Sequence, residues 1–471
     1  MVAGRLAVVA LLMVTLVACR DDGGGAAGSG AVTPSRAPTT TAAPTSLPAA
    51  TRPSCPAIPP RAEPAPDRPR YTLRVDVRPA QGVVDGDVRV RFTPDIATDR
   101  LVFRLWPNAP VLAVGGARLE TGAVTLDGRP VDAVLVEPTV LVVRPGRTLS
   151  AGAAVDVAVP WTLRLPAASG DRVSLDGEAV RLGSFFPILS WEPGVGWATE
   201  PPTGGFAEAS TAPTADFDLT VTVPDGLSVL ASGTNDRPGH WRATAMRDVA
   251  VSVGRFATAT AIARAPDPVE VTVGVHRGVG ASAEAYRDRV VASLEDFGRR
   301  FGAYPWPAYT LGITPRLRGG IEYPGHVMQG PGTLMSTTSH EVAHQWFYGL
   351  VGNDQGRDPW LDEGLATWAE GRFEGTLDAL RSRPLPAAAA GHLGEPMTYW
   401  DARPGAYYAG AYVQGAQALA ALGDLSLVDC ALRVYVAQEG HQVARPQDLV
   451  AATSAVFPNA AATLARFGVR P

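Results

Sequence analysis

Two histidines and a glutamate stand at a spacing that is typical of a zinc site. His340 and His344 are four residues apart, and Glu341 directly follows the first of them. On a helix this spacing places both imidazoles on one face, one turn apart, where they can hold one zinc ion. Glu341 can then accept a proton from a water molecule on the same metal, which predicts hydrolytic chemistry. The alternative is a capping box of Thr338 and Glu341 with both histidines partly buried.

A second segment supplies a third ligand. Glu363 follows His344 by nineteen positions. It opens a separate predicted helix, for which Asp358 is a good N-cap and Pro359 suits the first turn. Two histidines and one carboxylate leave the fourth zinc position open, as in a catalytic site. Glu370 shares the helical face of Glu363 and either orients a ligand imidazole or is a solvated charge.

These two segments resemble the aminopeptidase N family of zinc metallopeptidases, in the gluzincin clan, whose members include leukotriene hydrolase. The first reads His-Glu-Val-Ala-His-Gln-Trp from His340, and the second reads Trp-Leu-Asp-Glu-Gly around Glu363. The resemblance covers residues from about 70 to 471. It implies an α+β multidomain fold, in which a β-rich, saddle-like N-terminal domain precedes a thermolysin-like, mostly helical zinc peptidase domain. It also implies one zinc ion, bound by His340, His344 and Glu363.

A shorter motif around Glu322 is similar to the one with which the family binds the free amine of its substrates. The family has a Gly-x-Met-Glu-Asn motif whose glutamate binds the free amine of the substrate. Glu322 stands at that position, with Ile321 in place of Met and Tyr323 in place of Asn. A carboxylate there would pair with an α-ammonium and fix the cut after one residue. The changed neighbours keep an endopeptidase, or another zinc hydrolase with the same centre, as the alternative.

The family also has a Tyr-x-x-Gly-Ala element, whose tyrosine donates to the oxyanion of the tetrahedral intermediate. Two frames fit it here, one from Tyr407 and one from Tyr412. The spacing to the following Gly-Asp pair favours the first frame, so we predict that Tyr407 supports the oxyanion. Tyr408 and Tyr412 remain alternatives, and each of the three can instead be an aromatic residue packed at a helix start.

Hydrophobic periodicity indicates the elements that position these residues. Apolar and polar residues alternate at 71–77 and 217–223, and Asp-Gly turns separate such runs, which predicts a β-rich domain over 66–262. Between 281 and 302 the apolar residues recur every three or four positions, which predicts an amphipathic helix. Residues 263–471 are expected to form the catalytic domain with its C-terminal helices.

The first residues predict export. Arg5 precedes an apolar run of about a dozen residues that ends in Leu-Val-Ala-Cys and is too short to span a bilayer comfortably. We predict a lipoprotein signal peptide over 1–18, a lipidated Cys19 and a disordered tether over 19–65. The chain would then be anchored to the cell envelope outside the cytoplasm. An ordinary secretory signal with an incidental cysteine is the alternative.

Export leaves two further cysteines in an oxidising compartment. Cys55 and Cys430 either form one disulfide or stay apart as a loop thiol and a buried thiol. The net charge of −5, without a basic block, argues against a nucleic-acid partner. The sequence therefore predicts a monomeric zinc aminopeptidase that acts on peptides with Glu341 as general base. A surface lipoprotein that only binds, with a vestigial zinc site, is the alternative outside the enzymes.

Overall fold

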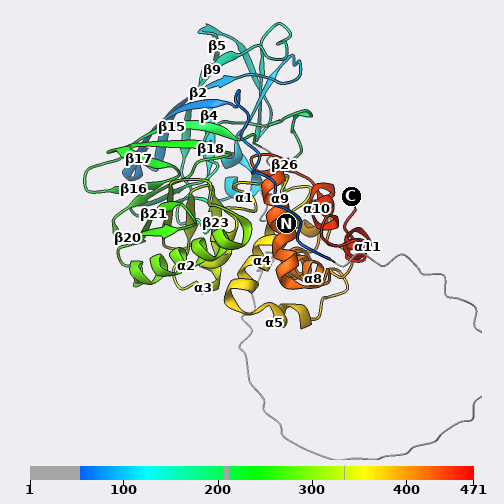
Figure 1. The fold of residues 1–471 in the computed structure, drawn as a ribbon. Helices are drawn as coiled ribbons and strands as arrows, with labels where there is room; N and C mark the ends of the chain where they lie inside the picture. The colour runs from blue at the N-terminus through cyan, green and yellow to red at the C-terminus, as the bar shows by residue number, and fades with distance from the viewer. Residues whose placement is uncertain (1–52, 205–211, 334, 471) are drawn as a thin grey trace, which may run out of the picture. The chain divides into compact units, whose positions relative to one another are not determined.

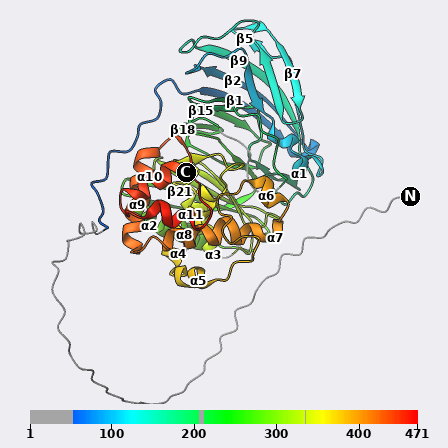
Figure 2. The ribbon, with the colours of Figure 1, turned by 90° about the vertical axis from the view of Figure 1, so that its right-hand side faces the viewer.

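The computed structural model describes residues 53–204, 212–333 and 335–470 (Figure 1). The predicted signal peptide, Cys19 and most of the predicted tether lie outside these residues. Strands gather on one side of the described part, and helices α8 to α11 gather on the other (Figures 1 and 2). Among the described residues, no helix is both long enough and apolar enough to span a membrane.

The largest sheet of the N-terminal part has nine strands. Their order is β17-β18-β15-β1-β2-β9-β5-β6, and β4 pairs with β9. The strands are β1 (Arg70–Arg78), β2 (Val83–Phe92), β4 (Arg118–Thr121), β5 (Thr125–Leu126), β6 (Arg129–Pro130), β9 (Val155–Arg164), β15 (Ala215–Thr222), β17 (Thr234–Arg237) and β18 (His240–Met246). In β1 the residues Tyr71, Leu73, Val75 and Val77 are buried, so the predicted alternation is confirmed.

Three smaller sheets complete the N-terminal part. One has the order β12-β3-β8-β7, a second β10-β11-β19-β16, and β13 pairs with β14. The bounds are β3 (Leu101–Arg104), α1 (Pro110–Ala113), β7 (Asp132–Glu137), β8 (Val140–Arg144), β10 (Val173–Asp176), β11 (Ala179–Leu182), β12 (Ile188–Leu189), β13 (Trp191–Glu192), β14 (Gly196–Trp197), β16 (Ser228–Ala231) and β19 (Val251–Gly254).

A five-stranded sheet opens the catalytic part, in the order β20-β21-β22-β24-β23. Its strands are β20 (Phe256–Arg264), β21 (Pro268–His276), β22 (Ala308–Ile313), β23 (Gly320–Tyr323) and β24 (His326–Gln329). β20 runs across residue 262, where the sequence placed a domain boundary. The helix α2 (Ala283–Phe301) packs on β20 and β21 and buries Val290, Leu294 and Phe297, as its periodicity predicts.

Helices form the rest of the chain. They are α3 (Met335–Ala343), α4 (Trp360–Glu374), α5 (Leu377–Ser382), α6 (Met397–Asp401), α7 (Pro404–Tyr407), the π-helical turn η3 (Tyr408–Val413), α8 (Gln414–Ala420), α9 (Leu425–Glu439), α10 (Pro446–Ser454) and α11 (Ala460–Ala465). Two short strands, β25 (Gly352–Asn353) and β26 (Val443–Ala444), pair in parallel. The predicted order of a β-rich part followed by a helical part is confirmed.

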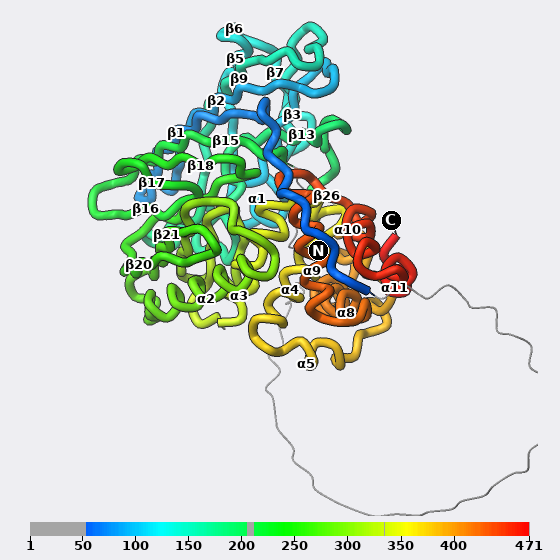
Figure 3. The backbone as a smooth tube through the Cα atoms, in the orientation of Figure 1, coloured from blue at the N-terminus to red at the C-terminus, as the bar shows by residue number. Residues whose placement is uncertain are grey.

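Residues 53–69, which we term the N-terminal strap, lie along the helical part before entering β1 (Figure 3). Cys55 and Cys430 form a disulfide, which resolves the two alternatives for these cysteines. The amide of Ala62 donates to Ala437 O at 2.8 Å, and Arg61 Nη1 donates to Ala303 O at 2.7 Å. The predicted disorder to residue 65 is therefore wrong for 53–65, because composition does not reveal these long-range contacts.

Candidate metal centre

The helix α3 carries the first half of the site. His340 and Glu341 lie in its last turn, and His344 follows one residue after its end. The chain keeps its helical turn there, since the His344 amide donates to His340 O at 3.3 Å. Both imidazoles consequently face the same side, with 3.1 Å between their Nε2 atoms.

The first turn of α4 brings Glu363 against both histidines. Glu363 Oε2 lies 3.2 Å from His340 Nε2 and 3.3 Å from His344 Nε2. One ligand atom from each of the three residues lies within 4.8 Å of the others. Two imidazole nitrogens and one carboxylate oxygen are a donor set that zinc prefers, so these residues fit the predicted metal.

The outer nitrogen of each imidazole has its own acceptor. His344 Nδ1 lies 3.1 Å from Phe347 O, and His340 Nδ1 lies 3.1 Å from Glu370 Oε2. A carbonyl and an ionised carboxylate only accept hydrogen bonds, so each Nδ1 donates. With Nδ1 as the donor on the outer side, each ring can release the proton of Nε2 and present that nitrogen's lone pair to a metal.

The pKa values of two carboxyl groups in the centre, Glu363 and Glu341, are shifted in opposite directions. Burial works against ionised Glu363, but hydrogen bonds from His340 and His344 outweigh it and lower the pKa of this carboxyl to about 2. Burial raises the pKa of Glu341 to about 8, and the nearby charge of Glu322 acts in the same direction. Glu341 Oε2 is buried and has no hydrogen-bond partner among the described residues. An anionic ligand and a carboxyl that can exchange a proton near neutrality thus lie side by side.

Strand β23 places the predicted amine anchor beside these groups. A carboxylate oxygen of Glu322 lies within 4.8 Å of ligand atoms of both Glu341 and His344. A Cβ on Gly320 would come within 2.4 Å of the Glu341 side chain, so only glycine leaves room for that carboxylate. Tyr323 Oη contacts Ser184 Oγ at 3.1 Å and thereby ties β23 to the N-terminal part. This contact accounts for the tyrosine in the motif.

The structure separates the three candidate tyrosines. Tyr412 Oη donates a short hydrogen bond to Glu363, and its ring stacks on His340 with 5.7 Å between centroids. Tyr407 is buried beside Tyr412, with 5.5 Å between their rings, whereas Tyr408 is 49% exposed. The predicted preference for Tyr407 is not what the geometry favours. Motif spacing alone does not separate the two frames, because Tyr407 directly precedes the π-helical turn η3 and Tyr412 lies within it, and no local pattern announced that turn.

Three residues that the sequence analysis missed lie behind the centre. Gln355 Nε2 donates to Glu322 Oε1 at 3.1 Å and to Asp362 Oδ2 at 2.5 Å. Asn353 Nδ2 donates to Asp362 Oδ1 at 3.1 Å. Burial raises the pKa of Asp362 to about 7, and the neighbouring Glu363 adds to the shift. Asn353 and Gln355 lie in a polar run between the two ligand segments, which does not distinguish a site from a surface loop, and Asp362 stands inside the second segment without a pattern that marks its role.

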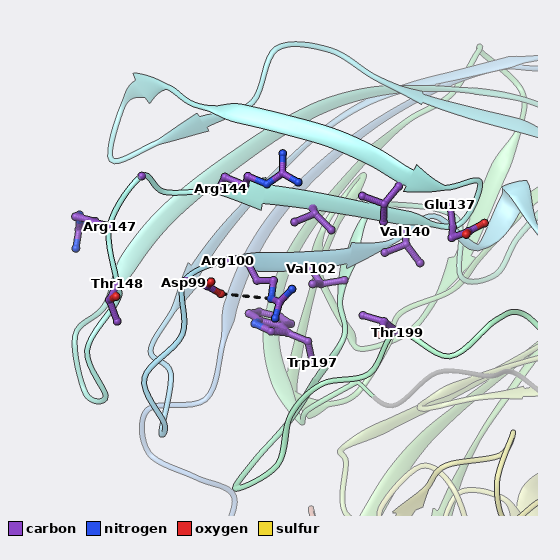
Figure 4. A pocket seen from close by; sticks show the side chains of 13 residues that line it. Asp99, Arg100, Val102, Glu137, Val140, Arg144, Arg147, Thr148, Trp197 and Thr199 are labelled. Atoms are coloured by element: carbon purple, nitrogen blue, oxygen red, sulfur yellow. Dashed lines mark ion pairs between the residues drawn. The ribbon is translucent and has the colours of Figure 1, made fainter.

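A separate pocket of about 770 Å³ lies in the N-terminal part (Figure 4). Val102, Val140 and Trp197 line it together with Arg100 and Arg144. None of the predicted site residues contributes to it. The chemistry that the sequence predicts is therefore concentrated between α3, α4 and β23.

Comparisons with known proteins agree with this arrangement. Residues 302–388 match the model of the Peptidase family M1 domain. Aminopeptidase B from Rattus norvegicus is 27% identical over 188 residues, which are 36% of this chain and 28% of that protein. Leukotriene A-4 hydrolase from Xenopus laevis is 36% identical over 101 residues, 20% of this chain and 16% of that protein. The chain thus spans less than a third of these curated relatives.

Solved structures match over a greater length. The M1 zinc metallopeptidase from Deinococcus radiodurans has a TM-score of 0.60 at 22% identity, covering 86% of this chain and 95% of that one. A mutant of it bound to a Tyr-ser-ala substrate has a TM-score of 0.62, also at 22% identity, covering 86% and 95%. This likeness confirms the predicted fold class.

Proposed function

The chain carries a Peptidase family M1 domain at residues 302–388, which confirms the predicted family, and on that premise we propose that it is a zinc-dependent aminopeptidase. The convergence of His340, His344 and Glu363 on one point carries the proposal, because three ligands with an open fourth position are typical of catalytic zinc. When bound, zinc supplies a Lewis acid and lowers the pKa of a coordinated water.

Glu341 is proposed to accept the proton of the attacking water and to pass it to the leaving amine. Its buried carboxyl lies beside the proposed ligands, and its pKa of about 8 suits both acceptance and release of a proton near neutrality. The base takes the proton from the attacking water and then gives it to the nitrogen of the leaving amine. Glu370 and Phe347 O keep the two histidines in the tautomer that can bind a metal.

Tyr412 is proposed to stabilise the oxyanion in place of Tyr407. Its hydroxyl donates to the proposed ligand Glu363, and the Tyr407 ring packs on the Tyr412 ring. A phenolic donor at this place can turn to the carbonyl oxygen as negative charge develops there. Glu322, close to both Glu341 and His344, is proposed to bind the substrate's α-ammonium, which makes the enzyme an exopeptidase.

Three reporters test this function on the purified protein. We expect cleavage of an unblocked aminoacyl reporter, loss of that cleavage in Glu341→Gln, and no cleavage of an N-acetylated copy or an internally quenched peptide. Cleavage of the two blocked peptides would establish the endopeptidase alternative. Absence of metal-dependent cleavage of all three would favour a binding protein.

We also propose that the chain is a monomeric lipoprotein of the cell envelope. The lipidation motif at Cys19 supports the anchor, and the disulfide between Cys55 and Cys430 supports an oxidising compartment. Membrane fractionation of the full chain is the test. Cys19→Ser should move the protein from the membrane to the soluble fraction, and unchanged membrane association would contradict the lipid anchor.

A further inference from the structure

Gln355 lies directly behind the proposed amine anchor, in the segment between β25 and α4. Its side chain is 3% exposed. Nε2 donates both of its hydrogens, to Glu322 Oε1 at 3.1 Å and to Asp362 Oδ2 at 2.5 Å. One amide group therefore links the anchor to the residue that precedes the proposed ligand Glu363.

The two acceptors determine which way this amide faces. Glu322 and Asp362 present carboxylate oxygens, so the NH2 group must face them and the carbonyl oxygen takes the other position on the amide carbon. Gln355 Oε1 is buried and has no hydrogen-bond partner among the described residues. Buried acceptors in folded proteins are nearly always paired, so Gln355 Oε1, which lies beside the proposed amine anchor, is available to a donor that arrives with a ligand.

Asp362 fixes the amide in this orientation. It is fully buried, and Asn353 Nδ2 donates to its other oxygen, Oδ1, at 3.1 Å. The same Asn353 nitrogen lies 3.1 Å from Asp358 O. Asp362 is thus held from two sides and serves as a rigid acceptor for Gln355. Asn353 and Asp362 act through Gln355 and are positioning residues.

We propose that Gln355 Oε1 is a second acceptor for the α-ammonium of the substrate, beside Glu322. The inference rests on the proposed aminopeptidase function. Because Gln355 Nε2 occupies Glu322 Oε1, the other carboxylate oxygen of Glu322 is left for the ammonium. Gln355 Oε1 stands on the same carbon as Nε2 and so lies close to that carboxylate. An ammonium carries three donors, and two fixed acceptors select a primary amine over an acylated one.

A pair of hydroxamates isolates this contact from catalysis. Leucine hydroxamate and its des-amino analogue, 4-methylpentanohydroxamate, share the metal-binding group and differ in the amine. The inhibition constants of both would be measured for the wild-type protein, Gln355→Met, Gln355→Glu and the control Gln417→Met. Gln417 is on α8 and donates to Leu380 O and Arg383 O, away from the centre. Zinc content and the midpoint of thermal unfolding verify that each variant is folded.

We expect Gln355→Met to lose its preference for the inhibitor that carries the amine, without weaker binding of the des-amino inhibitor. Gln355→Met should reduce the preference for the amine about ten- to hundredfold, as for a hydrogen bond to a charged group, and leave the des-amino constant unchanged. Gln355→Glu keeps an oxygen at this place and should retain the preference, while Gln417→Met should match the wild type. Equal weakening of both inhibitors in Gln355→Met, or equal loss of preference in the Met and Glu variants, would overturn the acceptor role. A wild-type protein without amine preference would overturn the proposed exopeptidase as well.

Discussion

At the scale of single residues, the centre gives two buried carboxylates different properties through their partners. Glu363 accepts from two imidazoles and holds its negative charge, whereas Glu341 lies close to Glu322 and its Oε2 lacks a donor among the described residues. Burial is common to both, so hydrogen bonding decides which group is ionised. This separation is what a hydrolase needs, because one carboxylate must hold a metal and the other must exchange a proton.

The tyrosine assignment leads to a first prediction. Tyr412→Phe should lower kcat by about a hundred- to a thousandfold, the usual loss for an oxyanion donor, with little change in KM. Tyr407→Phe should lower kcat by about tenfold at most, since the Tyr407 ring packs on Tyr412 and it is Tyr412 that donates to the proposed ligand. Steady-state kinetics on one unblocked reporter provide the comparison. A larger loss in Tyr407→Phe would restore the assignment that motif spacing favours.

The sequence revealed the candidate site residues that act at fixed spacing. His340, His344 and Glu341 lie on one helix, where the period of the helix alone brings them together. Glu363 could be found because a second helix start is readable from its cap. Gln355 could not be found, because its contacts depend on how an irregular segment folds back toward β23. Its buried carbonyl oxygen is a property of the tertiary structure.

At the scale of elements, β23 connects the centre to the N-terminal part. Gly320 at its start allows the Glu341 side chain to pass, and Tyr323 at its end contacts Ser184. A Cβ added to Gly183 would lie 2.4 Å from Tyr323 Oη, so a second glycine admits the tyrosine ring. The strand is thus positioned from both sides, and its position fixes Glu322 against the base.

This packing leads to a second prediction. In Gly320→Ala the new methyl group must displace Glu341, and a shift of the base by about 1 Å should reduce kcat by roughly a hundredfold. Gly405→Ala is the control, because a Cβ there meets no atom within 4 Å. Kinetics and thermal unfolding would be measured on both variants. An active Gly320→Ala protein would show that the base does not need this space.

A third prediction concerns pH and the buried Asp248, which accepts from Ser184 Oγ and from the Val249 amide. Burial raises its pKa to about 7. A raised pKa means that the folded state binds the proton more tightly, so the stabilisation is complete below about pH 4 and is lost as pH rises through about 7. The side chain at this position in the variant Asp248→Asn cannot ionise. The free energy of unfolding of this variant should therefore fall less than that of the wild type as pH rises, by roughly 2–4 kcal/mol.

Denaturant unfolding of the wild type and Asp248→Asn between pH 4.5 and 8 measures this effect. Other buried carboxyls with raised pKa values, such as Asp358 and Asp362, titrate in both proteins, so the difference between the two curves isolates Asp248. Parallel curves would show that Asp248 is already ionised in the folded protein at low pH.

The periodic elements could be predicted from the sequence, but their arrangement could not. The alternation in β1 and the apolar stripe of α2 are local, and the structure has both. The parallel pairing of β1 with β15 joins residues far apart in the chain, as does the path of β20 across the expected boundary at 262. Such pairings depend on sheet order, which a single strand pattern does not encode.

At the scale of the whole described chain, the disulfide joins its beginning to its late helices. Cys55 precedes the first strand, Cys430 lies in α9, and 375 positions separate them. The N-terminal strap adds a backbone hydrogen bond from Ala62 to Ala437 on the same helix. Because the cross-link encloses both the N-terminal sheets and the proposed centre, it restricts the unfolded chain over nearly its whole described length.

The last prediction follows from this disulfide. Cys55→Ser should reduce the free energy of unfolding by about 2–4 kcal/mol, because the unfolded chain regains the entropy that the cross-link removes. The activity of the folded variant should match the wild type, since the strap's hydrogen bonds to Ala303 and Ala437 lie away from the proposed zinc ligands in sequence and involve none of them. Denaturant unfolding with and without a reducing agent measures the difference. The reductant should destabilise the wild type to the level of Cys55→Ser and leave the variant unchanged, because the variant has no cross-link to lose. If the oxidised wild type were no more stable than the variant, the strap would be held by its hydrogen bonds alone.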